Sequence, residues 1–436
     1  MFLATGFLML KAQGGIGLDF KMVYNSARCL LDHHDPYKQA AIQKTYIENE
    51  QKLGVDCCSD LAALPLETRY WVYLPTIFAV SLPIAIFPMK VAFVLWTTLA
   101  AAGFLVAAAM MWNVGSEYAP RVTGAFLCLL LANSGTLVST GNAASPAISL
   151  SIIGAWCLIR ERAVIFGVIC MAMSLALKPH DSALIWLALF LFGGTVRKRA
   201  LQSAALMACS TVPVLLWVWQ IAPHWASELH LNVSELLAKG GMDDPGPAGV
   251  LKRGTMTLTN LQSVLSLIRN DPRFYNTASY VICFLTVGIL VFVTLRFRAS
   301  KESRWLAMAF VAALTLLPFY HRHYDSKILL VTIPACAFLW KRKDSMGRLA
   351  LLVTTVGLLM ASDLPWAFYI SATSNLQLSG TWAQLYFYSR ALPVPCAILL
   401  VAVFFLVAYI NDLRRGSALE DVPASSRAEW EAIENA

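Results

Sequence analysis

The feature that most constrains this chain is its series of long apolar segments. Residues 92–112, 281–295 and 391–410 contain no charged side chain. Runs of about 20 apolar residues are long enough to cross a bilayer as helices, and backbone polar groups in lipid must be satisfied within the helix. The whole chain is 58% hydrophobic and 14% charged, whereas a soluble domain has about 25% charged residues. We therefore expect an all-α, polytopic integral membrane protein.

Taken along the chain, the apolar segments predict about 11–13 transmembrane helices. They lie at residues 71–88, 91–112, 121–140, 146–159, 163–177, 181–194, 201–222, 278–296, 305–320, 326–340, 347–366 and 390–410. Residues 71–88 include Pro75 and Pro83, and proline disrupts a helix interior, so this segment is the candidate for a broken helix that crosses only halfway. Residues 1–10 are apolar but too few to span alone. We expect them to form either a short first helix extended through Gly17 or an incomplete first membrane helix.

Positive charge gathers in short clusters at the ends of these segments. The net charge of +8 could indicate nucleic-acid binding on a soluble protein. Here the clusters fall between expected spans, which is the distribution that marks cytoplasmic loops. They comprise Arg160 and Arg162; Arg197, Lys198 and Arg199; Arg296, Arg298, Lys301 and Arg304; Lys341, Arg342 and Lys343; and Arg414 and Arg415. The charge therefore predicts topology and no nucleic-acid partner.

This topology predicts a single membrane domain over residues 1–415. Residues 14–70 and 223–277 form its large extracytoplasmic loops, and residues 416–436 form a polar cytoplasmic tail. All seven histidines then fall on the extracytoplasmic side. Histidine changes charge near neutral pH, so this one-sided distribution favours an outward-facing site that handles protons or phosphate.

The first polar segment has helical periodicity. Its apolar residues recur at helical spacing, which predicts an amphipathic helix lying along the membrane surface; they are Phe20, Val23, Tyr24, Ala27 and Leu31. Asp35 followed by Pro36 is typical of the start of a second helix. Cys29 could form a disulfide with Cys57 or Cys58 if this loop is extracytoplasmic.

Two further polar clusters lie between expected spans. One contains Lys178, His180 and Asp181, and the other contains His321, Arg322, His323, Asp325 and Lys327. Charges beside a membrane core are costly and tend to be functional. The alternatives are a helix break with a snorkelling Lys178 for the first cluster and a solvated loop for the second.

Lysine, arginine and histidine gathered in one place can bind a phosphate or a diphosphate. A carboxylate nearby could serve as general base, and Asp19 at the start of the first polar segment is the candidate. Its other interpretation is a helix N-cap. A base and a phosphate pocket on the outer membrane surface together suggest transfer from a phosphate-linked lipid donor.

An ordered set of short motifs resembles the GT-C glycosyltransferases, and within them glycosyltransferase family 87, which includes polyprenol-phosphate-mannose-dependent α-mannosyltransferases. Asp19-Phe20 followed by Tyr24, Ala27, Arg28 and Asp35-Pro36-Tyr37 resembles the first extracytoplasmic loop of that family. The other matches in order are Tyr73-Leu74-Pro75, Gly141-Asn142, Leu177-Lys178-Pro179 and the cluster from His321 to Asp325. Leu74 replaces the first proline of the usual Tyr-Pro-Pro.

The resemblance implies a GT-C-type fold and an inverting transfer with Asp19 as general base. The donor phosphate would contact Lys178, His180, His321, Arg322, His323 and Lys327. The substrates would contact Tyr24, Asn25, Arg28, Asn142, Tyr324 and Asp325. The implied partners are a polyprenyl-phosphate sugar, a glycolipid or glycan acceptor and the lipid of a bacterial inner membrane. No metal or cofactor is required, because the departing lipid phosphate is already a stable anion.

Two other classes of function remain open at this stage. A transporter or flippase for lipid-linked or anionic substrates would also use broken helices and buried charge, but its site would lie near the midplane, often between related repeats. We detect no repeat, and the charge lies at span ends on one side. A non-catalytic scaffold would leave that one-sided basic cluster unexplained. These features favour an enzyme.

Overall fold

A computed structural model describes residues 2–12, 16–52, 70–241, 243–252, 258–297, 299–373 and 379–420. These residues form helices joined by short loops, with an isolated bridge between Leu258 and Arg322 as the one β-pairing among them. The elements are α1 (Phe2–Ala12), α2 (Leu18–Leu31), α3 (Gln39–Lys52), η3 (Pro75–Ile77), α4 (Phe78–Ala85), α5 (Met89–Gly115), α6 (Pro120–Ala132), α7 (Thr136–Ser139), α8 (Ala144–Ile159), α9 (Val164–Leu177), α10 (Pro179–Leu191), α11 (Gly194–Ile221), α12 (Trp225–Leu237), α13 (Pro247–Lys252), α14 (Leu261–Ile268), α15 (Pro272–Arg296), α16 (Lys301–Thr315), η4 (His323–Val331), α17 (Thr332–Lys341), α18 (Ser345–Met360), α19 (Asp363–Thr373), α20 (Gly380–Ala391) and α21 (Pro393–Glu420).

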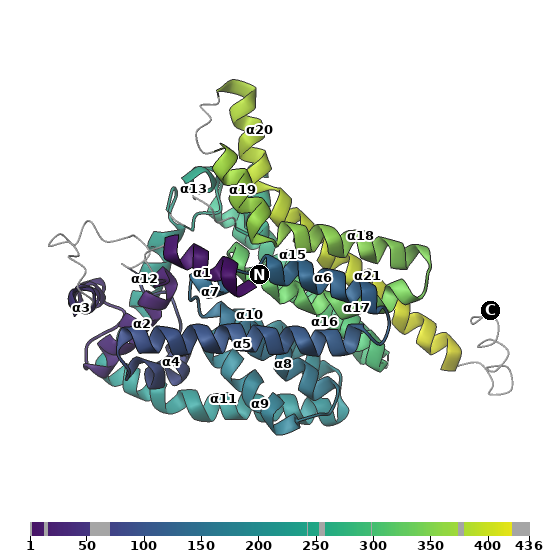
Figure 1. Cartoon of the computed structure of the whole chain (residues 1–436), viewed down its shortest axis with the longest axis horizontal. Helices are drawn as coiled ribbons and strands as arrows, with labels where there is room; N and C mark the ends of the chain where they lie inside the picture. The colour runs from purple at the N-terminus through teal and green to yellow at the C-terminus, as the bar shows by residue number, and fades with distance from the viewer. Residues whose placement is uncertain are drawn as a thin grey trace.

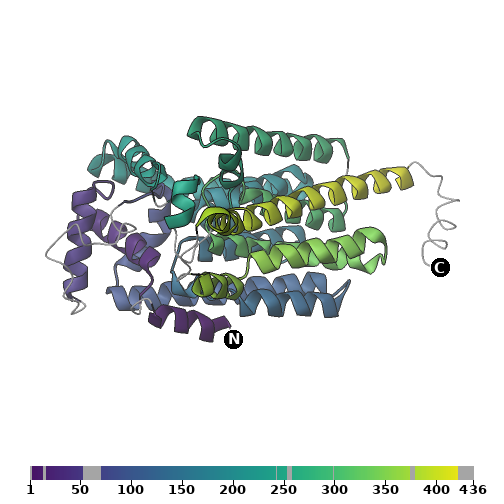
Figure 2. The same ribbon diagram turned by 90° about the horizontal axis from the view of Figure 1, so that it is seen from above.

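The longer helices run along the long axis of the molecule (Figure 1). Helices α8, α5 and α9 pack together, as do α16, α17, α18 and α21. Seen from above, α2 and α3 lie at one end and the last turns of α21 at the other (Figure 2). The bundle therefore has two distinct ends joined by its helices.

The surface of this bundle is suited to lipid. By length and composition, α5, α11, α15 and residues 393–416 of α21 could each cross a membrane, and six shorter apolar helical segments accompany them in the described part of the chain. Phe284 and Phe292 on α15 are 75% and 69% exposed, an exposure that water would disfavour but lipid accepts. The expected all-α, polytopic membrane protein is confirmed.

Residues 71–88 do not form a full span. They hold η3 and α4, and α4 has eight residues with Pro83 inside it. At 1.5 Å per residue α4 is about 12 Å long, against about 30 Å for the hydrocarbon core. The candidate for a broken helix is therefore confirmed, and residues 71–88 are removed from the expected spans.

The basic clusters gather at one end of the bundle, which we call the basic end. Arg160, after α8, pairs with Glu117, after α5, at 2.7 Å. The ring of Tyr118 lies 5.7 Å from the ammonium of Lys341 at the end of α17. The Tyr118 hydroxyl also donates to Glu302 in the first turn of α16 at 3.4 Å. These contacts place the loops after α5, α8, α15 and α17 together, as the charge pattern predicts.

The first polar segment is partly as expected. Helix α2 buries Phe20, Val23, Tyr24 and Ala27 of the predicted face, and Leu31 is half-buried. It is also buried on other sides, so the expectation of a one-sided helix on the membrane surface is wrong; the additional buried residues are Asn25, Ser26, Cys29 and Leu30. The helix start expected at Asp35 is wrong, because its carboxylate accepts from the backbone N–H of Tyr37 at 2.9 Å in a turn, and α3 begins only at Gln39. Cys29 is buried in α2. Its expected partners, Cys57 and Cys58, and most of the expected tail lie outside the described residues.

Candidate active site

Lys178 is placed by a break between two helices. The residue before a proline is disfavoured in helical conformation, and Lys178 precedes Pro179. Its backbone is extended, with φ −152° and ψ 82°, so α9 ends there and Pro179 occupies the first turn of α10. The side chain turns inward and is 6% exposed. Lys178 therefore does not snorkel to the surface.

Asn142 is placed by the loop between α7 and α8. Gly141 before it has a φ of +63°, and a Cβ on this residue would lie 2.5 Å from the Cβ of Phe20. Only glycine accommodates both the left-handed backbone and this close approach of α2. The Oδ1 of Asn142 accepts from the backbone N–H of Ala144 at 2.8 Å, which directs its Nδ2 toward α2.

Asp325 closes the first turn of η4. Its Oδ2 accepts from the backbone N–H of Arg322 at 2.9 Å, and its own N–H donates to the carbonyl of Arg322 at 2.9 Å. The carboxylate of Asp325 is 2% exposed. This double contact fixes the residues of the late histidine cluster relative to one another.

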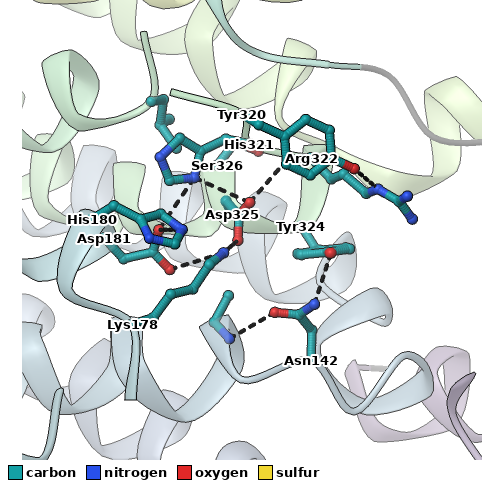
Figure 3. A network of polar contacts seen from close by, with 12 residues as sticks. Asn142, Lys178, His180, Asp181, Tyr320, His321, Arg322, Tyr324, Asp325 and Ser326 are labelled. Atoms are coloured by element: carbon teal, nitrogen blue, oxygen red, sulfur yellow. Dashed lines mark hydrogen bonds and ion pairs between the residues drawn. The ribbon is translucent and has the colours of Figure 1, made fainter. Parts of the chain in front are cut away.

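A buried ion network joins α10 to η4 (Figure 3). The ammonium of Lys178 lies 2.6 Å from Asp325 Oδ1 and 3.2 Å from Asp181 Oδ2. The Nδ1 of His321 lies 3.2 Å from Asp181 Oδ1 and 3.2 Å from Asp325 Oδ2. The ring of His180 packs on that of His321 with centroids 5.1 Å apart. Two carboxylates thus share one lysine and one histidine.

Asp19 reaches this region from the first turn of α2. Asn142 Nδ2 donates to Asp19 Oδ2 at 2.9 Å and also lies 2.8 Å from the hydroxyl of Tyr324 and 3.1 Å from that of Tyr73. Burial raises the pKa of Asp19, while the charge of Arg322 and the hydrogen bond from Asn142 act in the opposite direction. A carboxylate with a raised pKa in a polar site is suited to accept a proton.

A cavity of about 370 Å³, the polar pocket, opens beside this network. Its polar lining includes Asn142, Lys178, His180 and Asp325, and its remaining lining is mainly aromatic and aliphatic. A second cavity of about 430 Å³, the apolar pocket, lies between α10 and α15. The two pockets share three lining residues: His180, Tyr280 and Phe319. His180 therefore stands at the junction of a polar and an apolar space.

The structure brings together most of the predicted site residues: Asp19, Asn142, Lys178, His180, His321, Tyr324 and Asp325. Arg322 borders this group, since its guanidinium pairs with Asp243 at 2.9 Å. Of the six predicted phosphate-binding residues, only Lys178 and His180 line the polar pocket. His321 is fully buried and is not part of the pocket lining.

Two predicted phosphate-binding residues face elsewhere. Lys327 is fully buried and pairs with Asp363 at 2.7 Å. The Nδ1 of His323 lies 3.4 Å from the same carboxylate. The Lys327 ammonium also donates to the backbone carbonyl of Asn133 at 3.0 Å. This second buried ion pair ties η4 to the start of α19.

The predicted substrate residues further along α2 also lie apart from Asp19. Arg28 follows Asp19 by nine residues, or 2.5 helical turns, so the two lie on opposite faces. The Tyr24 hydroxyl donates to the carbonyl of Phe87 at 2.9 Å. Asn25 accepts from Asn49 of α3 at 2.8 Å.

Sequence reasoning left several contributors out of the predicted site. Tyr320 and Asp243 line the polar pocket, and Asp181 completes the ion network. Asp181 carried a signal, because it follows Lys178 and His180 at a helix break. Asp243 carried none, since its contact with Arg322 spans 79 residues of sequence.

Three side chains of the ion network have atoms close enough to hold a metal ion. His180, Asp181 and His321 offer ligand atoms that lie within 4.8 Å of one another. The Lys178 ammonium already lies 3.2 Å from Asp181 and would repel a divalent ion there. The arrangement favours an ion-pair cluster around Lys178, and the absence of a metal requirement stays a prediction.

The fold and the cavities together define the class of protein. It is an integral membrane protein whose polar pocket lies away from its basic end. The model of glycosyltransferase family 87 matches residues 71–319, and the chain belongs to that family. The match is consistent with the GT-C superfamily. No curated protein and no solved structure matches the chain. The matched range contains Asn142, Lys178 and His180 but not Asp19.

Proposed function

We propose that this membrane glycosyltransferase moves a hexose, mannose first among the candidates, from a polyprenyl-phosphate donor to a lipid or glycan acceptor. One observation carries the proposal. The polar pocket, with a cation and a carboxylate network, adjoins an apolar pocket that opens on the membrane surface, with Phe284 of its lining 75% exposed. A donor with a charged head and a hydrocarbon tail matches this pair of spaces.

The donor phosphate belongs at the junction of the two pockets. His180, 37% exposed through its side chain, reaches the junction, and Lys178 lies behind it. The polyprenyl tail then follows α10 and α15 into lipid. His321 and Arg322 support this site through the buried carboxylates. His323 and Lys327 are left out, because neither lines the polar or the apolar pocket and both face Asp363.

The reaction follows from this placement. The acceptor hydroxyl oxygen forms a bond to the anomeric carbon, its proton passes to Asp19, and the bond from that carbon to the phosphate oxygen breaks. Polyprenyl phosphate departs as an anion, stabilised by Lys178 and His180. Attack from the face opposite the leaving group inverts the anomeric centre. Asn142 holds the base in place through its 2.9 Å hydrogen bond.

The positive-inside rule supports the orientation of the site. The basic end would face the cytoplasm, so the polar pocket would open on the extracytoplasmic side of a bacterial inner membrane. Family membership favours this enzyme over the transporter or flippase alternative.

A donor screen tests the proposal. The purified full chain in liposomes is incubated with polyprenyl-phosphate mannose, glucose or arabinose, each radiolabelled, and a mixture of candidate acceptors. We expect transfer of label from one of the hexoses, with mannose the strongest. Movement of the intact lipid between leaflets without transfer would instead support a flippase.

Filling the apolar pocket should weaken binding of long-chain donors. Ala183→Trp on α10 places an indole among the apolar lining. Displacing about two buried methylenes costs roughly 1.6 kcal/mol, so KM should rise about fifteenfold for a long polyprenyl donor. A donor whose phosphate carries a methyl group in place of the polyprenyl chain should be unaffected, because it does not enter the apolar pocket. Ala109→Trp on the exposed face of α5 is the matched control. Equal effects on both donors would contradict the assignment of the tail to this pocket.

The pH dependence should report Asp19. A general base acts when deprotonated, so transfer falls as the pH drops through its pKa. Because burial raises that pKa, the acid limb of kcat/KM should lie above the ordinary range of an aspartate. Asn142→Leu removes a hydrogen bond that lowers the pKa, so the limb should move to still higher pH. A limb that stays in place in this variant would argue against Asp19 as the titrating base.

A further inference from the structure

A second polar cavity lies on the opposite side of α2 from Asp19. It has a volume of about 410 Å³ and is formed where α2, α3 and the turn between α4 and α5 meet. We call it the basic pocket, because three cationic residues line it: Arg28, Lys52 and Lys90. Among the described residues of its lining none is acidic.

The three cations of the basic pocket are only partly neutralised. Arg28 pairs with Asp32 at 3.4 Å, but Asp32 is half-exposed and lies outside the lining. Lys52 and Lys90 are both exposed. Like charges gathered around a cavity repel one another in the absence of a counter-charge. The pocket therefore presents a site for an anion.

The location of the basic pocket indicates which kind of anion it would bind. Ile86 and Phe87, which also line it, are 65% and 46% exposed. On the adjoining turns of α5, Val91 and Val94 are 46% and 60% exposed. A cationic cavity at the end of a lipid-facing helix lies at the level of lipid head groups, with apolar surface directly below it.

We propose that the basic pocket binds the phosphodiester head group of an anionic membrane lipid, whose acyl chains lie along the exposed face of α5. The lipid would bridge α2, through Arg28, to the start of α5, through Lys90. Helix α2 is already held to the turn before α5 by the hydrogen bond from the Tyr24 hydroxyl to the carbonyl of Phe87 at 2.9 Å. Since α2 carries Asp19 on its other face, the bound lipid would steady the helix that positions the proposed base. The inference does not depend on which sugar is transferred.

Native mass spectrometry of the full chain in detergent tests the proposal, with phosphatidylglycerol and phosphatidylcholine as probes. We expect phosphatidylglycerol to bind more tightly. Lys52→Gln/Lys90→Gln changes two exposed residues, so folding should be retained, and should weaken phosphatidylglycerol binding by about fivefold per charge removed. Lys90→Arg should keep binding. Lys44→Gln, on α3 but outside the lining, is the matched control.

Two results would overturn the proposal. One is equal binding of the anionic and the neutral lipid. The other is unchanged phosphatidylglycerol binding in the double variant. A competition experiment with glycerol phosphate distinguishes binding of a lipid from binding of a free phosphate. Glycerol phosphate should not displace phosphatidylglycerol at equal concentration. Full displacement would rule out a contribution of the acyl chains. Because every readout is lipid binding, failure here is distinguishable from failure of sugar transfer.

Discussion

Asp19→Asn should lower the rate of transfer by about 10²–10⁴-fold, the range that a general base contributes. The substitution keeps the size of the side chain and an oxygen that can accept the hydrogen bond from Asn142, which the native carboxylate receives at 2.9 Å. It removes only the capacity to take the acceptor proton. Transfer is measured with the radiolabelled polyprenyl donor, and donor affinity should change little, because the donor phosphate is assigned to Lys178 and His180.

Asp32→Asn supplies the control within the same region. Asp32 caps the end of α2, is half-exposed and pairs with Arg28 at 3.4 Å, at the far end of the helix from Asp19. Its substitution should leave transfer within about twofold of the native rate, since a surface ion pair contributes little. Full retention of transfer in Asp19→Asn, with normal expression and donor binding, would remove Asp19 as the base.

The fold was largely predictable because a membrane helix is a local property. Apolar segments such as 91–112 and 146–159 need no distant partner to be recognised, and the structure has helices there. Proline within residues 71–88 also acts locally, which is why the broken segment could be identified. The turn at Asp35 was mispredicted because an aspartate before proline can accept from the backbone of a turn as readily as it can begin a helix.

The site was less predictable because its contacts are distant in sequence. Lys178 and Lys327 carry the same signal, a lysine beside polar residues at the end of an apolar run. Tertiary packing separates them: Lys178 meets Asp325 across 147 residues and lines the polar pocket, whereas Lys327 meets Asp363 and is fully buried. The separation of Arg28 from Asp19, by contrast, follows from helical periodicity alone.

Lys327→Met should destabilise the protein by about 3–5 kcal/mol, because it leaves the buried carboxylate of Asp363 without its cation. The two groups lie 2.7 Å apart, and the lysine also donates to the carbonyl of Asn133. The measurement is the free energy of unfolding of the purified protein in detergent. Lys44→Met, in an exposed pair on α3, should change it by less than about 1 kcal/mol.

The double variant Lys327→Met/Asp363→Asn separates a structural role from a role in phosphate binding. Removing both charges leaves no uncompensated ion, so most of the lost stability should return. If Lys327 only ties η4 to α19, the folded double variant should transfer sugar at near the native rate. Lys178→Met also leaves buried carboxylates without their cation and should lower stability, but in the folded protein it should in addition raise the KM for the donor, because Lys178 lines the polar pocket. A double variant that is stable but has lost donor affinity would instead support the prediction that Lys327 binds the donor phosphate. Its ammonium would then be acting on the donor and not on Asp363.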